Sequence, residues 1–278
     1  MNQSESTAAI GLIGMGLMGG ALMKMLADAG FTIRGWDVEP ARRVNARASA
    51  DVFEHCERVF LCLPDSAITT AVLRDASLRA GQIMIDTSTG DPRKMAALGA
   101  ELAARDVHYL DATVSGSSAQ LLNHDVLVMA GGDAAVFERC GDLFTTFARE
   151  AVHVGPCGSG AKMKLVTNLV LGLNRAALAE GLAFAWDLHL NPAQTLDIMR
   201  RSMAYSRIMD TKGGKMVMQD FTPQAKLSQH LKDVRLMLSA TEMHLPLSET
   251  HRQLLEKAVS HGYGELDNSA IIKAILEP

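Results

Sequence analysis

A lysine and an asparagine near the start of one long apolar stretch form the pair of side chains best suited to chemistry. Lys164 and Asn168 are four residues apart, so a helix places them on the same face, one turn apart. An ammonium can transfer a proton, and an amide can hold the lysine or a substrate in place. The loop Gly155–Gly160 before them contains three glycines. The same pair would also suit an exposed lysine beside a polar neighbour at the start of an ordinary helix.

A second group of residues has the spacing of a dinucleotide-binding turn. Gly14-Met15-Gly16-Leu17-Met18-Gly19 follows the apolar run Ala8 to Ile13 and begins a helical pattern that extends from Leu17 to Ala29. Another apolar run, Phe31 to Trp36, ends at Asp37, eighteen positions after the third glycine. The order strand, glycine turn, helix, strand and terminal carboxylate predicts a Rossmann-type fold.

The three glycines of this turn have separate tasks. Gly14 allows the tight turn, Gly16 lets the backbone approach a pyrophosphate, and Gly19 lets the helix pack close to the strand. The N-terminus of the helix then offers free N–H groups and a partial positive charge to the phosphates. We expect all six residues from Gly14 to Gly19 to contact the cofactor.

Asp37 bears on which cofactor is used. Its carboxylate can accept hydrogen bonds from an adenosine ribose and would repel a 2'-phosphate. This favours NAD over NADP, while Arg34, Arg42 and Arg43 are near enough in the sequence to keep NADP open.

The alternation of strands and helices continues along the chain. Further strands are predicted at Arg58–Leu63, Gln82–Ile85, Val107–Leu110, Val126–Ala130 and Ala151–Val154. The carboxyl ends of parallel strands line the ligand crevice, so Leu63, Pro64, Ser88 and Thr89 are candidate cofactor neighbours. Thr89 would also fit the N-cap of a helix that starts near Asp91-Pro92.

Small hydroxyl residues follow the strand Val107–Leu110. The segment Asp111 to Ser118 reads as a loop in which Ser115, Gly116 and Ser117 could hold a substrate carboxylate with hydroxyl and backbone N–H groups. An equally good interpretation is a serine-rich loop that caps a short helix.

The second half of the chain is predicted to be helical. A helix from Ala161 to Leu190 joins an N-terminal domain, 1–160, to an all-α domain, 161–278. The fold class is therefore α/β, with a doubly wound Rossmann-type sheet followed by helices. In a later helix, predicted from Pro223 to Ala240, Lys232 stands beside an apolar stripe, where a lysine on the solvated face would serve as well.

The composition excludes several classes of partner. The 278 residues are 48% hydrophobic and 21% charged, with a net charge of -4, so no basic surface for nucleic acid or an anionic membrane is expected. The start MNQSEST lacks the features of a signal peptide, and no run of eighteen apolar residues occurs. We expect a cytoplasmic protein that binds neither nucleic acid nor membrane.

Cysteines and histidines give no sign of a metal. Cys56, Cys62, Cys140 and Cys157 have irregular spacing, which favours reduced thiols. The nine histidines include no HExxH pattern. No metal site is predicted.

Four of these motifs, in this order, resemble the β-hydroxyacid dehydrogenase family, which includes 3-hydroxyisobutyrate dehydrogenase. The motifs are the N-terminal IGLIGMGLMG, the segment Asp111-Ala112-Thr113-Val114-Ser115-Gly116, the segment Gly158 to Asn168, and Leu231-Lys232-Asp233-Val234. The resemblance spans nearly the whole chain. It implies that Lys164 is the catalytic lysine and that Asn168 positions it or the substrate. It also implies that Ser115 and Gly116 hold a substrate carboxylate and that Lys232 lies near the nicotinamide.

The chain departs from the family pattern at four positions. Thr113 stands where a proline is usual, Thr167 where a first asparagine is usual, and Ser117 and His124 where glycines are common. Ser117 and His124 border the substrate motif, so they bear on the identity of the substrate more than on the type of reaction.

The resemblance implies oxidation of a small β-hydroxyacid by NAD, or the reverse reduction of an aldehyde acid, in a homo-oligomer that is a dimer or a tetramer. Lys164 would exchange the hydroxyl proton, helped by burial and the charge of Lys232, which favour the neutral amine. Within the same fold an imine reductase is the nearest alternative, and a sugar-acid phosphate dehydrogenase would need a larger helical domain. A non-catalytic dinucleotide-binding scaffold is the alternative from another class.

Overall fold

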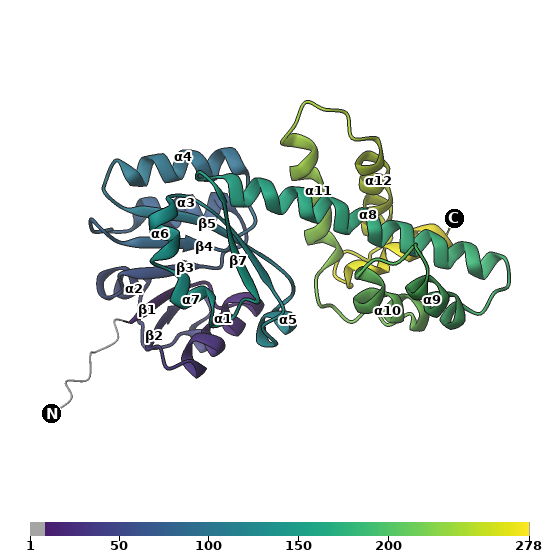
Figure 1. The fold of residues 1–278 in the computed structure, drawn as a ribbon, viewed down its shortest axis with the longest axis horizontal. Helices are drawn as coiled ribbons and strands as arrows, with labels where there is room; N and C mark the ends of the chain where they lie inside the picture. Colours follow the sequence, from purple (N-terminus) through teal and green to yellow (C-terminus); the bar gives the residue numbers. More distant parts are fainter. Residues whose placement is uncertain (1–8, 278) are drawn as a thin grey trace. The chain divides into compact units, whose positions relative to one another are not determined.

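The computed structural model describes residues 9–277, which divide into two compact units, Met1–Lys164 and Leu165–Pro278 (Figure 1). The first unit alternates strands and helices. Its strands are β1 (Ile10–Ile13), β2 (Ile33–Trp36), β3 (Arg58–Leu61), β4 (Ile83–Asp86), β5 (His108–Ser115), β6 (Leu127–Gly131) and β7 (Glu150–Gly155). Its helices are α1 (Leu17–Asp28), the 3₁₀ turn η1 (Pro40–Arg42), α2 (Ser49–His55), α3 (Ser66–Asp75), α4 (Pro92–Ala103), α5 (Ser118–Leu122), α6 (Ala134–Glu138) and α7 (Gly141–Phe144).

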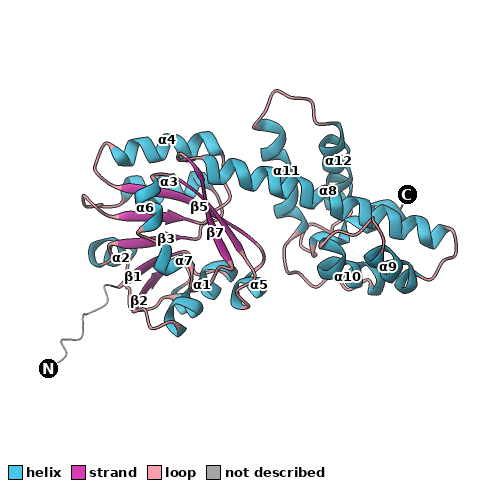
Figure 2. Cartoon of the chain, in the orientation of Figure 1, coloured by secondary structure: helices cyan, strands magenta, loops and turns pink. Residues whose placement is uncertain are grey.

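One seven-stranded sheet forms the centre of the first unit, in the order β2-β1-β3-β4-β5-β6-β7 (Figure 2). The first five strands in this order are parallel, and only β5 and β6 pair antiparallel. The chain leaves β1 toward β2 on one side and β3 on the other, so the strand order reverses at β1. Ligands of open α/β sheets bind at such a reversal, beyond the carboxyl ends of the strands.

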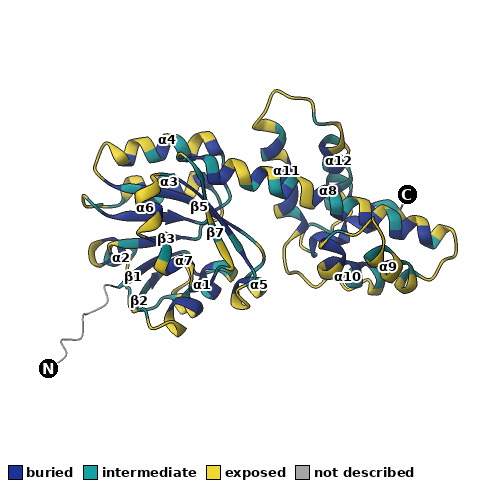
Figure 3. Ribbon diagram, in the orientation of Figure 1, coloured by how far each residue is buried: buried dark blue, intermediate teal, exposed yellow. Residues whose placement is uncertain are grey.

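Alternating side chains of the strands separate two cores. Along β3, Phe60 belongs to the core under α1, α5, α6 and α7, whereas Val59 and Leu61 belong to the core under α2, α3 and α4. This is the two-residue period of a strand with both faces covered. The central strands β1 and β4 are buried along their whole length, whereas the edge strand β7 is partly exposed (Figure 3). The predicted doubly wound fold is confirmed.

Every regular element that the structure describes in the second unit is helical. After α8 (Ser159–Asp187) follow α9 (Pro192–Arg201), the π-helical turn η2 (Met209–Gly213), α10 (Gly214–Met218), α11 (Leu227–Ser239), α12 (Pro246–Ser260), the 3₁₀ turn η3 (Asn268–Ile272) and α13 (Lys273–Leu276). Apolar residues of α8, α11 and α12 form a third core, which includes Leu182, Val234 and Leu255. Asp267 binds the backbone N–H groups of Gln224 and Ala225, and α11 begins only at Leu227, later than predicted.

Helix α8 has 29 residues and a mean hydropathy of 1.2 over its most apolar window, enough by length and composition to cross a bilayer. Its buried side instead packs in protein, because Leu178, Ala179 and Leu182 belong to the third core. Arg175 on the same helix is 2% exposed, and a guanidinium is costly in a bilayer. We interpret α8 as a helix of a folded domain that packs in protein along one side.

One strand end predicted in the first unit is wrong. The chain after β6 forms two short helices, α6 and α7, and Gly141 starts the second. The Phe137 and Phe144 rings stack at 5.4 Å between centroids. The strand predicted to end at Leu110 continues to Ser115, because residues 111–115 pair with β6.

Candidate functional site

The carboxyl ends of β2, β1, β3 and β4 form one row across the sheet, and this row continues to Asp111 within β5. In the strand register Trp36 pairs with Ile13, Ile13 with Leu61, Leu61 with Asp86, and Asp86 with Asp111. The predicted cofactor residues of the first unit follow shortly after this row. Ser115, Gly116 and Ser117 lie further along, where β5 ends, and Lys164 lies on α8. The sheet therefore collects segments that are far apart in the sequence.

The glycine turn fits a dinucleotide. Gly14 has a φ of +88°, a left-handed conformation that favours glycine. A Cβ on Gly19 would collide with the carbonyl oxygen of Gly14, whereas one on Gly16 would meet nothing within 4 Å. Gly16, the N-cap of α1, has no side chain that could accept from the helix, so the first N–H groups of α1 are available to phosphates. Met15 is buried in the core, while Leu17 is 78% exposed and Met18 is half-buried.

Asp37 lies against this turn. Its Oδ2 accepts a hydrogen bond from the Met15 N–H at 2.6 Å, and its Oδ1 accepts one from the Glu39 N–H at 2.8 Å. The residue is 6% exposed. Each carboxylate oxygen has a further lone pair, so the geometry leaves acceptor capacity for a ribose hydroxyl.

The three arginines near Asp37 differ in their surroundings. Arg34 donates to the Asn45 carbonyl at 2.9 Å. Arg43 donates to the carbonyls of Asp37 and Val38 and lies over the Trp36 ring, 5.4 Å from its centroid. Only Arg42 approaches the carboxylate, with 3.9 Å between its Nη1 and Asp37 Oδ1.

The segments after β3 and β4 are tied together. The Leu63 N–H donates to Ser88 Oγ at 3.0 Å, and Pro64 follows at the start of the loop to α3. Thr89 is half-buried beyond β4, but it does not cap the next helix. The N-cap of α4 is Asp91, whose carboxylate accepts from the Arg93 N–H at 2.9 Å. The capping role proposed for Thr89 from the sequence is wrong.

The predicted substrate residues lie where β5 passes into α5. Ser115 is the last residue of the strand, and Gly116 has a φ of +146°. Ser117 is the N-cap of α5, and its Oγ accepts from the Gln120 N–H at 3.3 Å. The alternative of a capping serine is confirmed for Ser117. His124, where the family pattern has a glycine, keeps a left-handed backbone with a φ of +54°.

Lys164 reaches the end of β5. Its half-buried ammonium donates a hydrogen bond to the Val114 carbonyl at 2.7 Å. Val114 directly precedes Ser115, so the ammonium lies beside the segment predicted to bind the substrate. Sequence alone gave no sign of this contact, because the two residues are 50 positions apart.

Asp111 holds the start of α8, a role that the sequence reasoning missed. Its Oδ1 accepts from the Gly158 N–H and its Oδ2 from the Ala161 N–H, each at 2.8 Å. Thr113 adds a hydrogen bond from its Oγ1 to the Gly160 carbonyl at 3.0 Å. In the sequence Asp111 directly follows the predicted strand Val107–Leu110, and a carboxylate buried there must accept hydrogen bonds. This sequence feature could have indicated the role of Asp111.

Burial sets the ionisation of several groups along the row. Desolvation raises the pKa of Asp86 to about 6, although the Tyr109 hydroxyl donates to it at 2.6 Å. Desolvation also raises the pKa of Asp111. The pKa of the Cys62 and Cys157 thiols rises to about 12 for the same reason, so neither is a reactive thiolate. Residues 9–277 contain no group of three or more histidine, cysteine or acidic side chains that could hold a metal.

The remaining predicted residues lie in the second unit. Asn168 on α8 is 9% exposed, and Lys232 on α11 is half-buried.

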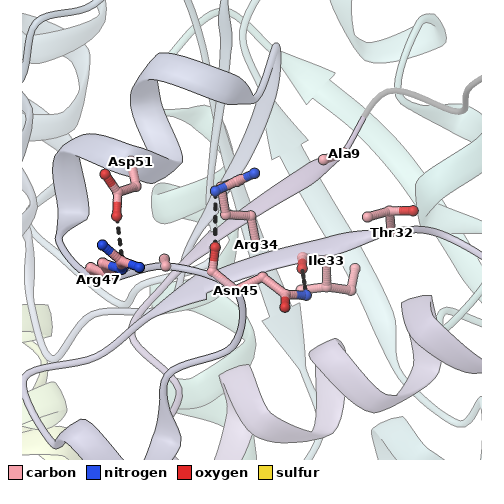
Figure 4. A pocket seen from close by; sticks show the side chains of 8 residues that line it. Ala9, Thr32, Ile33, Arg34, Asn45, Arg47 and Asp51 are labelled. Atoms are coloured by element: carbon pink, nitrogen blue, oxygen red, sulfur yellow. Dashed lines mark hydrogen bonds between the residues drawn. The ribbon is translucent and has the colours of Figure 1, made fainter.

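A polar pocket of about 660 Å³ lies at the other end of the sheet (Figure 4). It is lined by Ala9, Thr32, Ile33, Arg34, Asn45, Ala46, Arg47 and Asp51. These residues precede β1 or β2, lie in the first half of β2, lie between β2 and α2, or, for Asp51, lie in the first turn of α2. The pocket contains none of the predicted site residues, and it lies at the amino ends of the strands, opposite the glycine turn.

Comparisons with known proteins bear on both units. Residues 9–155 match the family described as the NAD binding domain of 6-phosphogluconate dehydrogenase. Residues 158–275 match the family described as the NAD-binding domain of NADP-dependent 3-hydroxyisobutyrate dehydrogenase.

Individual relatives cover nearly all of this chain. The 2-hydroxy-3-oxopropionate reductase of Escherichia coli (strain K12) is 29% identical, with 96% of each chain covered. The cytokine-like nuclear factor N-PAC of Mus musculus is also 29% identical, over 96% of this chain and 51% of its own length. A crystal structure of 3-hydroxyisobutyrate dehydrogenase from Salmonella typhimurium superposes with a TM-score of 0.86 at 25% identity, covering 95% of this chain and 99% of that one.

Proposed function

Because the chain belongs to the β-hydroxyacid dehydrogenase family, we propose that it transfers a hydride between NAD and a small β-hydroxyacid of the 3-hydroxyisobutyrate type, or the corresponding aldehyde acid. The fit of the glycine turn to a dinucleotide and the hydroxyacid relatives support this proposal. We also propose a cytoplasmic location, which the four free cysteines support.

The observation that carries the proposal is the position of the Lys164 ammonium. It lies 2.7 Å from the Val114 carbonyl, beside Ser115 at the end of β5. A substrate carboxylate bound by the Ser115 hydroxyl and the Gly116 N–H would place its hydroxyl within reach of this ammonium.

In the proposed reaction the residues of the chain bind the substrate and move one proton. The bound nicotinamide supplies the hydride acceptor. Lys164, as the neutral amine, accepts the proton of the substrate hydroxyl while the carbinol hydrogen leaves with its electron pair. In the reverse direction the protonated lysine donates to the developing alkoxide. Asn168 and Lys232 are proposed to orient the lysine and the cofactor.

Replacing Lys164 tests the reaction. Lys164→Ala should lower kcat by roughly 10²- to 10⁴-fold, the usual contribution of a general acid or base, because no other group would take the hydroxyl proton. Absorbance of reduced nicotinamide across a panel of hydroxyacids and aldehyde acids measures turnover, and fluorescence titration with NADH measures cofactor binding. NADH affinity should be retained, since the glycine turn is unchanged.

Lys162→Ala is the matched control, because Lys162 is an exposed lysine two residues before Lys164 on α8. It should keep wild-type turnover. Full activity of Lys164→Ala would show that the lysine has been assigned the wrong role. If the wild-type protein binds NADH but turns over no member of the panel, it is a dinucleotide-binding scaffold instead.

A further inference from the structure

We propose that Asp111 is a positioning residue, whose buried carboxylate fixes the first turn of α8 and so places the Lys164 ammonium at the end of β5. The inference rests on the proposed function, which it deepens. Asp111 touches no reacting atom in this scheme and acts through the helix.

The hydrogen bonds of Asp111 join one strand to one helix start. Both carboxylate oxygens are used, one by the Gly158 N–H and one by the Ala161 N–H. These donors come before and within the first turn of α8, where backbone N–H groups have no partner inside the helix. The negative charge also suits the positive end of the helix dipole. Asp111 therefore acts as the cap of α8, although it lies on another element.

The contact between the two backbones is too close for side chains. A Cβ on Gly160 would collide with the carbonyl oxygen of Asp111, and one on Gly131 would lie 2.9 Å from the Gly160 N. The start of α8 thus lies directly on the backbones of β5 and β6. Asp111, which is fully buried at 0% exposed, holds this junction together.

Two of the hydrogen bonds that join β5 to α8 are made by Asp111 and by Lys164. Asp111 binds the Ala161 N–H, and three residues further along each element the Val114 carbonyl accepts from Lys164. If the hydrogen bond between Asp111 and the Ala161 N–H is lost, the first turn of α8 can shift along β5 and move the Lys164 ammonium with it. A misplacement of about 1 Å at a reacting group can cost on the order of 100-fold in rate.

Asp111→Asn and Asp111→Ala test the inference. The asparagine keeps one acceptor oxygen but turns its amide N–H₂ toward the second backbone N–H, and the alanine keeps neither bond. We expect kcat to fall by roughly 10- to 100-fold in Asp111→Asn, and further in Asp111→Ala. The KM for NAD should stay within about twofold, since α1 and the glycine turn are not tied to α8 by Asp111.

The control is Leu26→Ala, a truncation of a fully buried leucine of α1, which lowers stability without touching α8. It should keep wild-type kcat well below its melting temperature. Equal kcat in Asp111→Asn and this control would overturn the positioning role. A crystal structure of Asp111→Asn should show the Lys164 Nζ to Val114 O distance lengthened, and an unchanged distance would also overturn it. Failure of the proposed reaction would appear separately, as full activity of Lys164→Ala.

Discussion

At the scale of single residues, Asp37 combines a structural and a selective task. Its carboxylate already accepts two backbone hydrogen bonds, from Met15 and Glu39, and it thereby fixes the glycine turn against the end of β2. The same charge would repel a 2'-phosphate on the adenosine ribose. Arg42, at 3.9 Å, is the nearest cation that could offset this repulsion.

We therefore predict that the wild-type protein prefers NAD. Asp37→Ser should lower the ratio of kcat/KM with NAD to kcat/KM with NADP by about tenfold, equivalent to ~1.4 kcal/mol. Serine removes the charge but keeps a hydroxyl for the ribose. Steady-state kcat/KM with NAD and NADP, measured side by side, gives the ratio. An unchanged ratio in Asp37→Ser would mean that the carboxylate stabilises the glycine turn but does not select the cofactor. Glu39→Gln, which alters an exposed carboxylate two residues later, serves as the control.

At the scale of elements, three helices of the second unit meet around two histidines. The rings of His230 on α11 and His251 on α12 have centroids 5.1 Å apart. Arg175 on α8 donates to His230 Nε2 at 3.4 Å. A Cβ on Gly172 would lie 2.7 Å from His251 Cε1, so the glycine allows the rings to approach α8. His251 is 3% exposed, and its Nε2 has no hydrogen-bond partner among the described residues.

This packing makes the second unit sensitive to acid. Burial, and then the charge of Arg175, lower the pKa of His251 to about 4, whereas an unfolded histidine titrates near ~6.5. Between these values the unfolded chain binds the proton and the folded chain does not. Stability is therefore lost as the pH falls from about 6.5 to about 4, by up to ~3 kcal/mol from this group. Chemical denaturation at a series of pH values measures this loss.

His251→Asn should flatten the pH dependence by about this amount, because it removes the titrating ring. Asp86 in the first unit opposes the trend, since its raised pKa of about 6 favours the folded state on acidification. The difference between variant and wild type cancels this contribution. Leu255→Ala, which loosens the same core without removing a charge, should keep the wild-type slope. If both variants have the same slope, the histidine has no part in the acid response.

At the scale of the whole molecule, one side of α8 remains apolar and exposed. Val166, Val170, Ala177 and Phe184 have the spacing of one helix face and are all exposed, with Phe184 at 62%. Such a stripe is typical of an interface between protein chains. We propose a homo-oligomer, either a dimer or a tetramer, that buries this stripe.

Light scattering coupled to gel filtration should then give a mass that is a multiple of 29.9 kDa. Phe184→Asp should shift the population toward the monomer, because it places a charge in an apolar contact. Met243→Asp changes another exposed apolar residue, on the loop between α11 and α12, and should leave the mass unchanged. A wild-type mass of one chain would refute the oligomer.

The sequence by itself determined the features that depend on neighbours along the chain. The short apolar runs of the strands, the glycines around Gly14 and the helical spacing of Lys164 and Asn168 are short-range patterns, and they predicted the fold class and most elements. The sequence could not choose between competing local interpretations. Thr89 and Asp91 suit an N-cap equally well, and Ser117 suits both a cap and a substrate site.

Only the tertiary structure decided which distant groups meet. The extension of β5 to Ser115 depends on its pairing with β6, and local propensity does not specify a partner strand. Asp111 and Ala161 are 50 positions apart, so their hydrogen bond follows from the sheet register and the path of the chain into α8. Lys164 could be selected from its spacing and its motif. Its contact with Val114, and the carboxylate that fixes the start of its helix, required the folded chain, because hydrogen-bond partners are chosen by register and packing.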